Sequence, residues 1–350
     1  MGNGYYDRCF DTPLYVTLSR PTNGEAVSKG RSGATQHDIF FLTPSIMNIL
    51  VTGSSGTIGT RLCETLLSKG HDVIGIDWVK NKWQPSVQKI THLIDLRDEK
   101  KLAHATLPSD IDAIVHLAAN ARVYELVEHP DRARDNLLTT FNVLEFARAR
   151  GIKRFLFASS REVYGNTKAE TYTEDMVHVE HCESPYTASK LAGEALVESY
   201  TRCYGIDHII FRFSNVYGMY DDSERVVPIF IRKTRKNEPI VVFGKDKCLD
   251  FTYIDDTVSG IIAALVKFET AKNDTYNIAF GEGTTIVHLA GEVKRLTGSR
   301  SAVSVGEPRT GEVVRYIADI SKAKTKLGYD PKVSFGGGIK KAVEWYLEHT

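Results

Sequence analysis

A glycine-rich turn near the start of the compact part of the chain constrains the fold more than any other feature. The segment 53–59, Gly-Ser-Ser-Gly-Thr-Ile-Gly, separates the apolar run Ile49–Val51 from a helical stretch that continues to about Ser68. Glycines allow a tight turn and a close approach to the backbone, and the helix start offers free N–H groups and a positive dipole end. A strand, such a turn and a helix together predict a pyrophosphate site. Its candidate contacts are Gly53, Gly56, Thr57, Ile58 and Gly59.

An acidic residue follows at the spacing that a dinucleotide site needs. Asp77 ends the second apolar run, 18 residues after Gly59, where a carboxylate can hold the ribose hydroxyls of NAD. The next residue is Trp78, with no arginine beside it to hold a 2′-phosphate, so the sequence favours NAD over NADP. A glycine triplet alone also fits an ordinary turn, and the spacing to Asp77 is what makes it a cofactor prediction.

The ends of the next two apolar runs supply further candidates for cofactor binding. Asp95, followed by Leu96, ends the third run and could meet the adenine amino group. Leu117, Ala118 and Ala119 follow the fourth run, where small residues would let the cofactor lie against the backbone. His116, just before them, is interpreted as a packed strand residue and not as a catalyst.

Short apolar runs alternate with helical stretches as far as residue 213. After the first strand and helix come Val73–Ile76, Ile90–Asp95, a helix near Lys100, Ile111–Leu117, a helix around Asp135–Arg150, Phe155–Ala158, a helix around Tyr186–Tyr204, and Ile209–Phe213. Continuous buried-type strands separated by helices predict a parallel sheet covered on both faces. The fold class is therefore α/β, a doubly wound (Rossmann) sheet. The irregular pattern after 213 predicts a smaller C-terminal α/β domain at the strand ends, where ligands bind.

Composition excludes several kinds of function. Lys plus Arg (44) equals Asp plus Glu (44), so no global charge attracts nucleic acid or an anionic membrane. No apolar run approaches the roughly 20 residues that span a bilayer. Five scattered cysteines without a CxxC pair favour neither a disulfide framework nor a zinc ribbon, and they fit the cytoplasm. His178, His181 and Cys182 are interpreted as a polar loop before a helix, and no metal site is predicted.

Residues 1–46 differ from the rest. They are rich in Gly, Ser, Thr, Asn and Arg, lack clear periodicity, and do not resemble a signal peptide. We interpret them as a dispensable extension, with the compact part beginning at Met47.

A tyrosine and a lysine share one helix face after Pro185, a residue that favours a helix start. Tyr186 and Lys190 are four positions apart, and an ammonium near a phenol favours the phenolate. Tyrosine can then act as a general base near neutral pH. Ser160, just after the run Phe155–Ala158, could hydrogen-bond the same substrate hydroxyl. YxxxK alone is common on surface helices, and its meaning here rests on the joint pattern with the glycine turn and Asp77.

These motifs together resemble the extended short-chain dehydrogenase/reductase family, in the nucleotide-sugar epimerase/dehydratase branch that includes UDP-glucose 4-epimerases. The resemblance runs from Met47 nearly to the C-terminus. It rests on the glycine turn, DL at 95–96, HLAA at 116–119, Asn136, SSREVYG at 159–165, SPYTASK at 184–190, RFSNVYG at 212–218, DFTYIDD at 250–256 and RTGEVVRYIADISKAKTKLGY at 309–329. It implies that Ser160, Tyr186 and Lys190 are catalytic, with Lys190 also holding the nicotinamide ribose. It further implies that Asn136 contributes to the cofactor site, and that Asn215 and Arg309 bind the nucleotide sugar.

The resemblance leaves several reactions open. The family oxidises a sugar at C4, and the first expectation is a 4-epimerase of the UDP-glucose/UDP-galactose type. Dehydratases of the family resemble Thr-Asp-Glu where this chain has Ser160-Arg161-Glu162. A guanidinium cannot serve as the acid, which weakens dehydration. Glu162 keeps a decarboxylase or 4,6-dehydratase as an alternative, and a net NAD-dependent oxidoreductase is another. Arg161 and Glu162 are included among the candidate substrate contacts.

One departure and two further expectations follow from the resemblance. The family commonly has an arginine that grips the diphosphate at the position of Leu249; Arg225, Lys245 or Lys247 could compensate. The NAD-binding domain is expected over 47–212 plus about 249–268, and the nucleotide-sugar-binding domain over 213–248 plus about 269–350. A homodimer through the helices around 135–150 and 186–204 is the expected assembly.

Overall fold

The computed structural model describes residues 46–349. The predicted dispensable extension, 1–46, therefore lies almost entirely outside the described residues.

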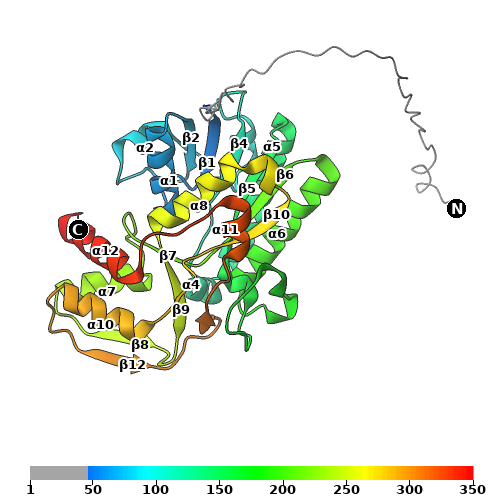
Figure 1. The fold of residues 1–350 in the computed structure, drawn as a ribbon. Helices are drawn as coiled ribbons and strands as arrows, with labels where there is room; N and C mark the ends of the chain where they lie inside the picture. The colour runs from blue at the N-terminus through cyan, green and yellow to red at the C-terminus, as the bar shows by residue number, and fades with distance from the viewer. Residues whose placement is uncertain (1–45, 350) are drawn as a thin grey trace, which may run out of the picture. The chain divides into compact units, whose positions relative to one another are not determined.

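A seven-stranded parallel sheet forms the centre of the fold (Figure 1). Its order is β3-β2-β1-β4-β5-β6-β10, which reverses direction between β1 and β4 and so creates a crevice at the carboxyl ends of these two strands. The strands are β1 Asn48–Thr52, β2 Asp72–Asp77, β3 Thr91–Leu93, β4 Ala113–His116, β5 Arg154–Ser160, β6 Asp207–Phe213 and β10 Asp274–Ile278. The predicted doubly wound sheet is confirmed.

Helices bury both faces of this sheet. On one face pack α1 Thr57–Ser68, α2 Pro85–Ile90 and α8 Ile254–Val266; on the other pack α3 Glu99–Ala103, α5 Asp131–Arg150 and α6 Pro185–Tyr204. Alternate residues of β1 explain the two layers, because Ile49 and Val51 face the first core while Leu50 faces the second. The helix α6 begins at an N-cap, Ser184, whose hydroxyl accepts from the Thr187 N–H, and ends at the left-handed Gly205.

Two smaller sheets lie beyond the carboxyl ends of the central strands. One joins β7 Asn215–Tyr217, β9 Cys248–Tyr253, β11 Gly283–Thr285 and β13 Arg315–Tyr316; the other pairs β8 Ile240–Phe243 with β12 Val303–Gly306. The helices of this part are α7 Val226–Arg235, α10 Ile286–Leu296 and α12 Phe335–His349. Figure 1 shows α7, α10, β8 and β12 gathered below the central sheet, with α12 beside them.

The remaining elements are short. They are the helices α4 Val123–Glu128, α9 Phe268–Ala271 and α11 Ser321–Leu327, and the 3₁₀ turns η1 Arg161–Tyr164, η2 Glu174–Met176 and η3 Val179–His181.

One local prediction differs from the structure. The strand predicted over 90–95 is only Thr91–Leu93, because Pro85 starts a helix that continues through Ile90. The region after 213 contains both helices and strands, as the predicted α/β class requires.

The predicted domain division stays a prediction. The strand β10 pairs with β6 in the central sheet, although 269–350 was assigned to the smaller domain. One hydrophobic core runs from Met47 to Tyr346 and crosses the predicted boundary.

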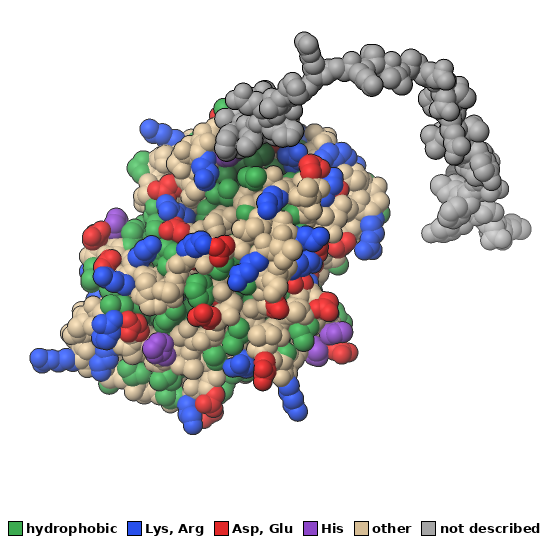
Figure 2. Space-filling view, in the orientation of Figure 1, with side chains coloured by type: hydrophobic (Ala, Val, Ile, Leu, Met, Phe, Trp, Pro, Cys, Tyr) green, Lys and Arg blue, Asp and Glu red, His purple; other side chains and the backbone are tan. Residues whose placement is uncertain are grey.

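The surface carries no region of a single charge on the face shown in Figure 2, where acidic and basic side chains are interspersed. Within residues 46–349, no helix combines the length and apolarity that a membrane crossing requires.

Candidate active site

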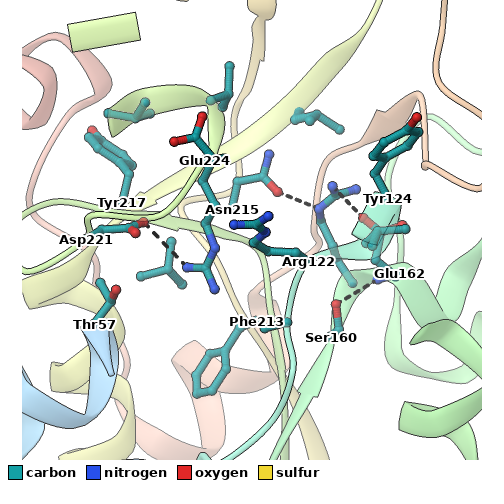
Figure 3. A pocket seen from close by; sticks show the side chains of 18 of the residues that line it. Thr57, Arg122, Tyr124, Ser160, Glu162, Phe213, Asn215, Tyr217, Asp221 and Glu224 are labelled. Atoms are coloured by element: carbon teal, nitrogen blue, oxygen red, sulfur yellow. Dashed lines mark hydrogen bonds and ion pairs between the residues drawn. The ribbon is translucent and has the colours of Figure 1, made fainter. Parts of the chain in front are cut away.

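A cavity of about 730 Å³ opens between the central sheet and the smaller sheets (Figure 3). It receives side chains from the turn after β1, the ends of β4 and β5, the start of α6, and the segment 213–233. Of the predicted site residues, those that line it are Gly53, Gly56, Thr57, Ile58, Gly59, Leu117, Ala119, Ser160, Arg161, Glu162, Tyr186, Lys190, Asn215 and Arg309. In Figure 3, Thr57 and Asp221 lie on one side of the cavity and Ser160 and Glu162 on the other.

The glycine turn has the geometry of a cradle for a dinucleotide. Gly53 has φ +73, and a Cβ there would lie 2.8 Å from the backbone nitrogen of Ala118. A Cβ on Gly59 would lie 1.9 Å from the carbonyl oxygen of Gly53. No side chain caps the start of α1 at Gly56, so its first N–H groups remain available for an anion. The turn thus fits a pyrophosphate held by backbone.

Asp77 is connected directly to this turn. One carboxylate oxygen accepts from the Ser55 N–H at 2.9 Å and the other from the Val79 N–H at 3.1 Å. Burial raises the pKa of Asp77, while these N–H donors oppose that shift. The carboxylate is therefore fixed beside the turn, at the end of β2, and its contact with a ribose stays a prediction.

Four further predicted cofactor residues, like Asp77, do not line the cavity. Asp95 pairs with Arg97 at 2.7 Å, and Leu96 lies in the core under α5. Ala118 approaches the glycine turn through its backbone. Asn136 donates to Ser189 Oγ at 3.2 Å and accepts from the Asn120 N–H at 2.7 Å. It thus ties the segment after β4 to α6.

His116 is a buried core residue, as expected. Its two ring nitrogens bond to Thr52 Oγ1 at 2.7 Å and to Thr140 Oγ1 at 3.2 Å, and burial lowers its pKa to about 3. His178 and His181 make a ring contact, and residues 46–349 hold no group of three or more side chains suited to a metal.

Ser160, Tyr186 and Lys190 meet in the cavity. Burial is the largest influence on the pKa of the Tyr186 phenol and raises it, while the hydrogen bond with Ser160 lowers it to a smaller extent. Lys190 Nζ donates to the carbonyl of Ala158 at 2.8 Å and lies 5.9 Å from the centre of the Tyr186 ring. The expected lowering of the Tyr186 pKa by Lys190 is therefore not the net outcome here, because the lysine is bonded to the backbone and the phenol is buried.

Replacing Lys190 with Met should change how stability depends on pH. Burial lowers the pKa of Lys190 to about 8 from an ordinary value of 10.5. Between these values the unfolded chain keeps a proton that the folded protein has lost, so the lysine destabilises the fold below pH 8 and ceases to do so by pH 10.5. A shift of this size corresponds to about 3 kcal/mol, and the lost bond to Ala158 offsets about 1 kcal/mol.

We expect Lys190→Met to match or exceed the wild type in free energy of unfolding at about pH 7.5, and to lose that advantage by about pH 10. Urea unfolding at the two pH values measures the difference. A difference between the proteins that stays constant with pH would contradict the assignment.

Arg161 and Glu162 form a buried pair beside Ser160. Arg161 Nη2 lies 2.6 Å from Glu162 Oε1, and Arg161 Nε donates to Asn215 Oδ1 at 2.7 Å. Glu162 Oε2 accepts from the Val313 N–H at 3.3 Å. Burial raises the pKa of Glu162, and the nearby Arg161 and Lys247 oppose that rise. The predicted substrate residues Arg161, Glu162 and Asn215 are thus one connected cluster.

Other cations border the cavity where the expected arginine is absent. Leu249 is buried, and Arg225, Lys247 and Arg309 line the cavity, while Lys245 does not. Arg309 stacks on the rings of Phe243 at 4.1 Å and Tyr124 at 4.9 Å. The sequence reasoning missed Arg122 and Lys233, which also line the cavity; they belong to no motif, and only the folded chain brings them there.

Comparison with known proteins agrees with this geometry. The sequence model of the NAD dependent epimerase/dehydratase family matches residues 49–279. A putative UDP-glucose 4-epimerase of Methanocaldococcus jannaschii is 36% identical over 307 residues, which are 85% of this chain and 97% of that protein. Other similar proteins are a UDP-glucuronate 4-epimerase of Thermodesulfobacterium geofontis and a dTDP-glucose 4,6-dehydratase of Haemophilus influenzae, 31% and 29% identical over 86% of this chain and 96% and 98% of theirs.

Two solved structures share the fold closely. UDP-glucose 4-epimerase of Thermotoga maritima, solved with UDP-glucose, has a TM-score of 0.79 and 32% identity over 86% of this chain and 99% of its own. UDP-glucose 4-epimerase of Thermus thermophilus, solved with NAD, has a TM-score of 0.79 and 29% identity over 87% of this chain and 100% of its own.

Proposed function

This chain belongs to the NAD dependent epimerase/dehydratase family, and within it we propose a nucleotide-sugar 4-epimerase of the UDP-glucose/UDP-galactose type. The family and its relatives establish the coarser assignment, an NAD-dependent enzyme that epimerises or dehydrates a nucleotide sugar. One observation carries the finer proposal: the Ser160–Tyr186 pair faces the cavity, while the only carboxylate in segment 160–162 is engaged by Arg161 and a backbone N–H.

Each group in the cavity has a separate role in this reaction. Tyr186 removes the proton from the sugar C4 hydroxyl. Ser160, which is hydrogen-bonded to the Tyr186 phenol, holds the same hydroxyl in place. The glycine turn would hold NAD, which would supply the acceptor and donor of the C4 hydride. Lys190, when charged, favours the phenolate. For epimerisation the 4-keto sugar would turn within the cavity, so that the hydride returns to the opposite face of C4 while Tyr186 gives its proton back to the C4 oxygen.

The alternative reactions need a Glu162 carboxyl that is free to act, and its contacts restrict it. Elimination of water needs a carboxyl that is free to move a proton, whereas Glu162 is bound at one oxygen by Arg161 and at the other by Val313. Decarboxylation of a uronic acid remains the second candidate because Glu162 borders the cavity. Net oxidation is the third.

Products identify the reaction. Purified protein with catalytic NAD is incubated with UDP-, dTDP-, GDP- and CDP-sugars, and the products are examined by mass spectrometry and NMR. Unchanged mass with inverted C4 supports the proposal. Loss of water or carbon dioxide, or NADH formed in proportion to substrate, replaces it with the corresponding alternative.

The diphosphate would be held by cations from outside β9. Arg225 lies 3.7 Å from Asp221, a loose pair, and is one-third exposed toward the cavity. Lys247 is tightly paired with Glu312 at 2.5 Å and is less available. We therefore assign to Arg225 and Arg309 the role that Leu249 cannot perform.

We also propose a homodimer through α5 and α6. Leu137 and Leu138 lie four and three positions before Phe141 on α5, and all three are more than one-third exposed. Such an exposed apolar patch indicates a partner surface.

The unpaired thiols Cys63, Cys182, Cys203 and Cys248 support a cytoplasmic location.

Phe141→Asp should weaken the dimer by at least about tenfold, because it places a charge in an apolar contact. Sedimentation velocity over a concentration series measures this. Leu347→Asp, at an exposed position on α12, is the matched control and should leave assembly unchanged. A monomeric wild type, or equal behaviour of the two variants, would contradict the surface.

A further inference from the structure

The wall of the cavity beside Ser160 consists of two ion pairs. The first is Arg161–Glu162 at 2.6 Å, with both side chains more than nine-tenths buried. The second is Lys247–Glu312 at 2.5 Å, also largely buried. All four residues line the cavity, and Glu162 lies within electrostatic range of the other three. The wall therefore carries two positive and two negative groups.

We propose that this wall selects nucleotide sugars with an uncharged substituent on C5 and discriminates against glycuronates. The inference rests on the proposed function, since it takes the C4 hydroxyl to meet Tyr186 and Ser160. The relatives include epimerases named for both sugar classes, so membership of the family leaves the choice open.

The position of the wall brings it close to the deciding group. Arg161 and Glu162 directly follow Ser160 in chain order, at the point where the reacting hydroxyl binds. In a glycuronate the carboxyl carbon is two bonds from C4. With the C4 hydroxyl at Ser160, its charge would therefore bind in the part of the cavity that these ion pairs line.

The guanidinium of Arg161 already has two partners, one of which is a carboxylate. Nη2 serves Glu162 and Nε serves Asn215, so a glycuronate would add a second carboxylate beside Glu162 without a second free cation from the wall. Like charges in a buried site repel strongly.

The remaining nitrogen of Arg161 can serve a sugar hydroxyl. Nη1 is buried and has no hydrogen-bond partner among the described residues. An unpaired buried donor is unfavourable, and a hydroxyl oxygen reached by a small shift of the side chain would satisfy it. The wall therefore offers a donor to a hydroxyl and a neutral environment to the group that carries it.

The test compares two substrates across four proteins. NAD-loaded wild type, Glu162→Gln, Glu312→Gln and the control Glu292→Gln are assayed for kcat/KM and Kd with UDP-glucose and UDP-glucuronate. Glu292 pairs with Arg295 on α10 and does not line the cavity, so its loss changes net charge equally but remotely.

We expect the wild type and Glu292→Gln to favour UDP-glucose. Glu162→Gln should move the ratio toward UDP-glucuronate by about tenfold or more, because it leaves Arg161 with an uncompensated charge. Glu312→Gln should move it in the same direction, and it keeps the test decisive if the more buried Glu162 variant does not fold. A wild type that prefers UDP-glucuronate, or ratios unchanged in both wall variants, overturns the inference.

The assays distinguish failure of the proposed function from failure of the inference about the wall. If no protein epimerises either sugar, the function is wrong, and the ratio of the two Kd values still tests the wall. If epimerisation occurs without the expected ratios, the function stands and the wall is wrong.

Discussion

Tyr186→Phe should lower kcat for sugar epimerisation by about 10²- to 10⁴-fold, the usual contribution of a positioned general base. The substitution removes one oxygen whose hydrogen-bond partner is Ser160, and the ring keeps its packing against Leu126 and Ala133. The loss should therefore fall on kcat, while KM for the nucleotide sugar, NAD content and thermal stability change little.

The measurement is steady-state kinetics of C4 inversion, with bound NAD quantified after denaturation. Tyr204→Phe is the matched control, since Tyr204 lies on the same helix but is half-exposed and outside the cavity. Activity of Tyr186→Phe within a few-fold of wild type would remove Tyr186 from its role. The pH–rate profile adds a second check: the acid limb reports ionisation of the buried phenol and should disappear from any residual activity of the variant.

Gly59→Ala should weaken NAD binding strongly, because the added methyl group would clash with the backbone of the glycine turn. Within α1 alanine is normally the better residue by about 1 kcal/mol. Here its Cβ would lie 1.9 Å from the Gly53 oxygen and 2.9 Å from Ser54 Cα, and both are backbone atoms that cannot turn aside. We expect a loss of about 1–3 kcal/mol or more in stability and at least about a hundredfold weaker NAD binding.

The control is the same substitution where the helix is open. Gly291 lies in α10, and a Cβ added there would have no atom within 4 Å outside its own helix backbone and chain neighbours. Gly291→Ala should therefore stabilise the protein by up to about 1 kcal/mol. Thermal unfolding with and without NAD, together with titration calorimetry, separates the two variants. Normal NAD affinity in Gly59→Ala would show that the turn does not hold the pyrophosphate.

Local signals explain which parts of the fold could be predicted. The glycine turn, Asp77 and the capped helix from Pro185 each depend on neighbours close in sequence, and the structure has all three. The strand β10 depends on a partner, β6, that ends at Phe213, far earlier in the chain, and its own sequence is too short and polar to indicate a central strand.

The same distinction between local and long-range signals applies to the residues of the site. Tyr186 and Lys190 were found because their spacing is fixed by one helix. The preference of Lys190 for the Ala158 carbonyl, and the engagement of Arg161 by Asn215, arise between elements that only the folded chain brings together. No sequence spacing specifies them.

The late position of β10 in the chain has a consequence for synthesis on the ribosome. The strand β6 is complete by Phe213, but its outer neighbour begins only at Asp274, after β7, α7, β8, β9, α8 and α9 have emerged. If the sheet forms as the chain emerges, Ile209, Ile210 and Phe211 would lie on an unpaired edge until then. Chains that terminate before Ile278 should therefore be prone to aggregation and degradation. Although β10 comes late in the sequence, its loss should destabilise the central sheet strongly.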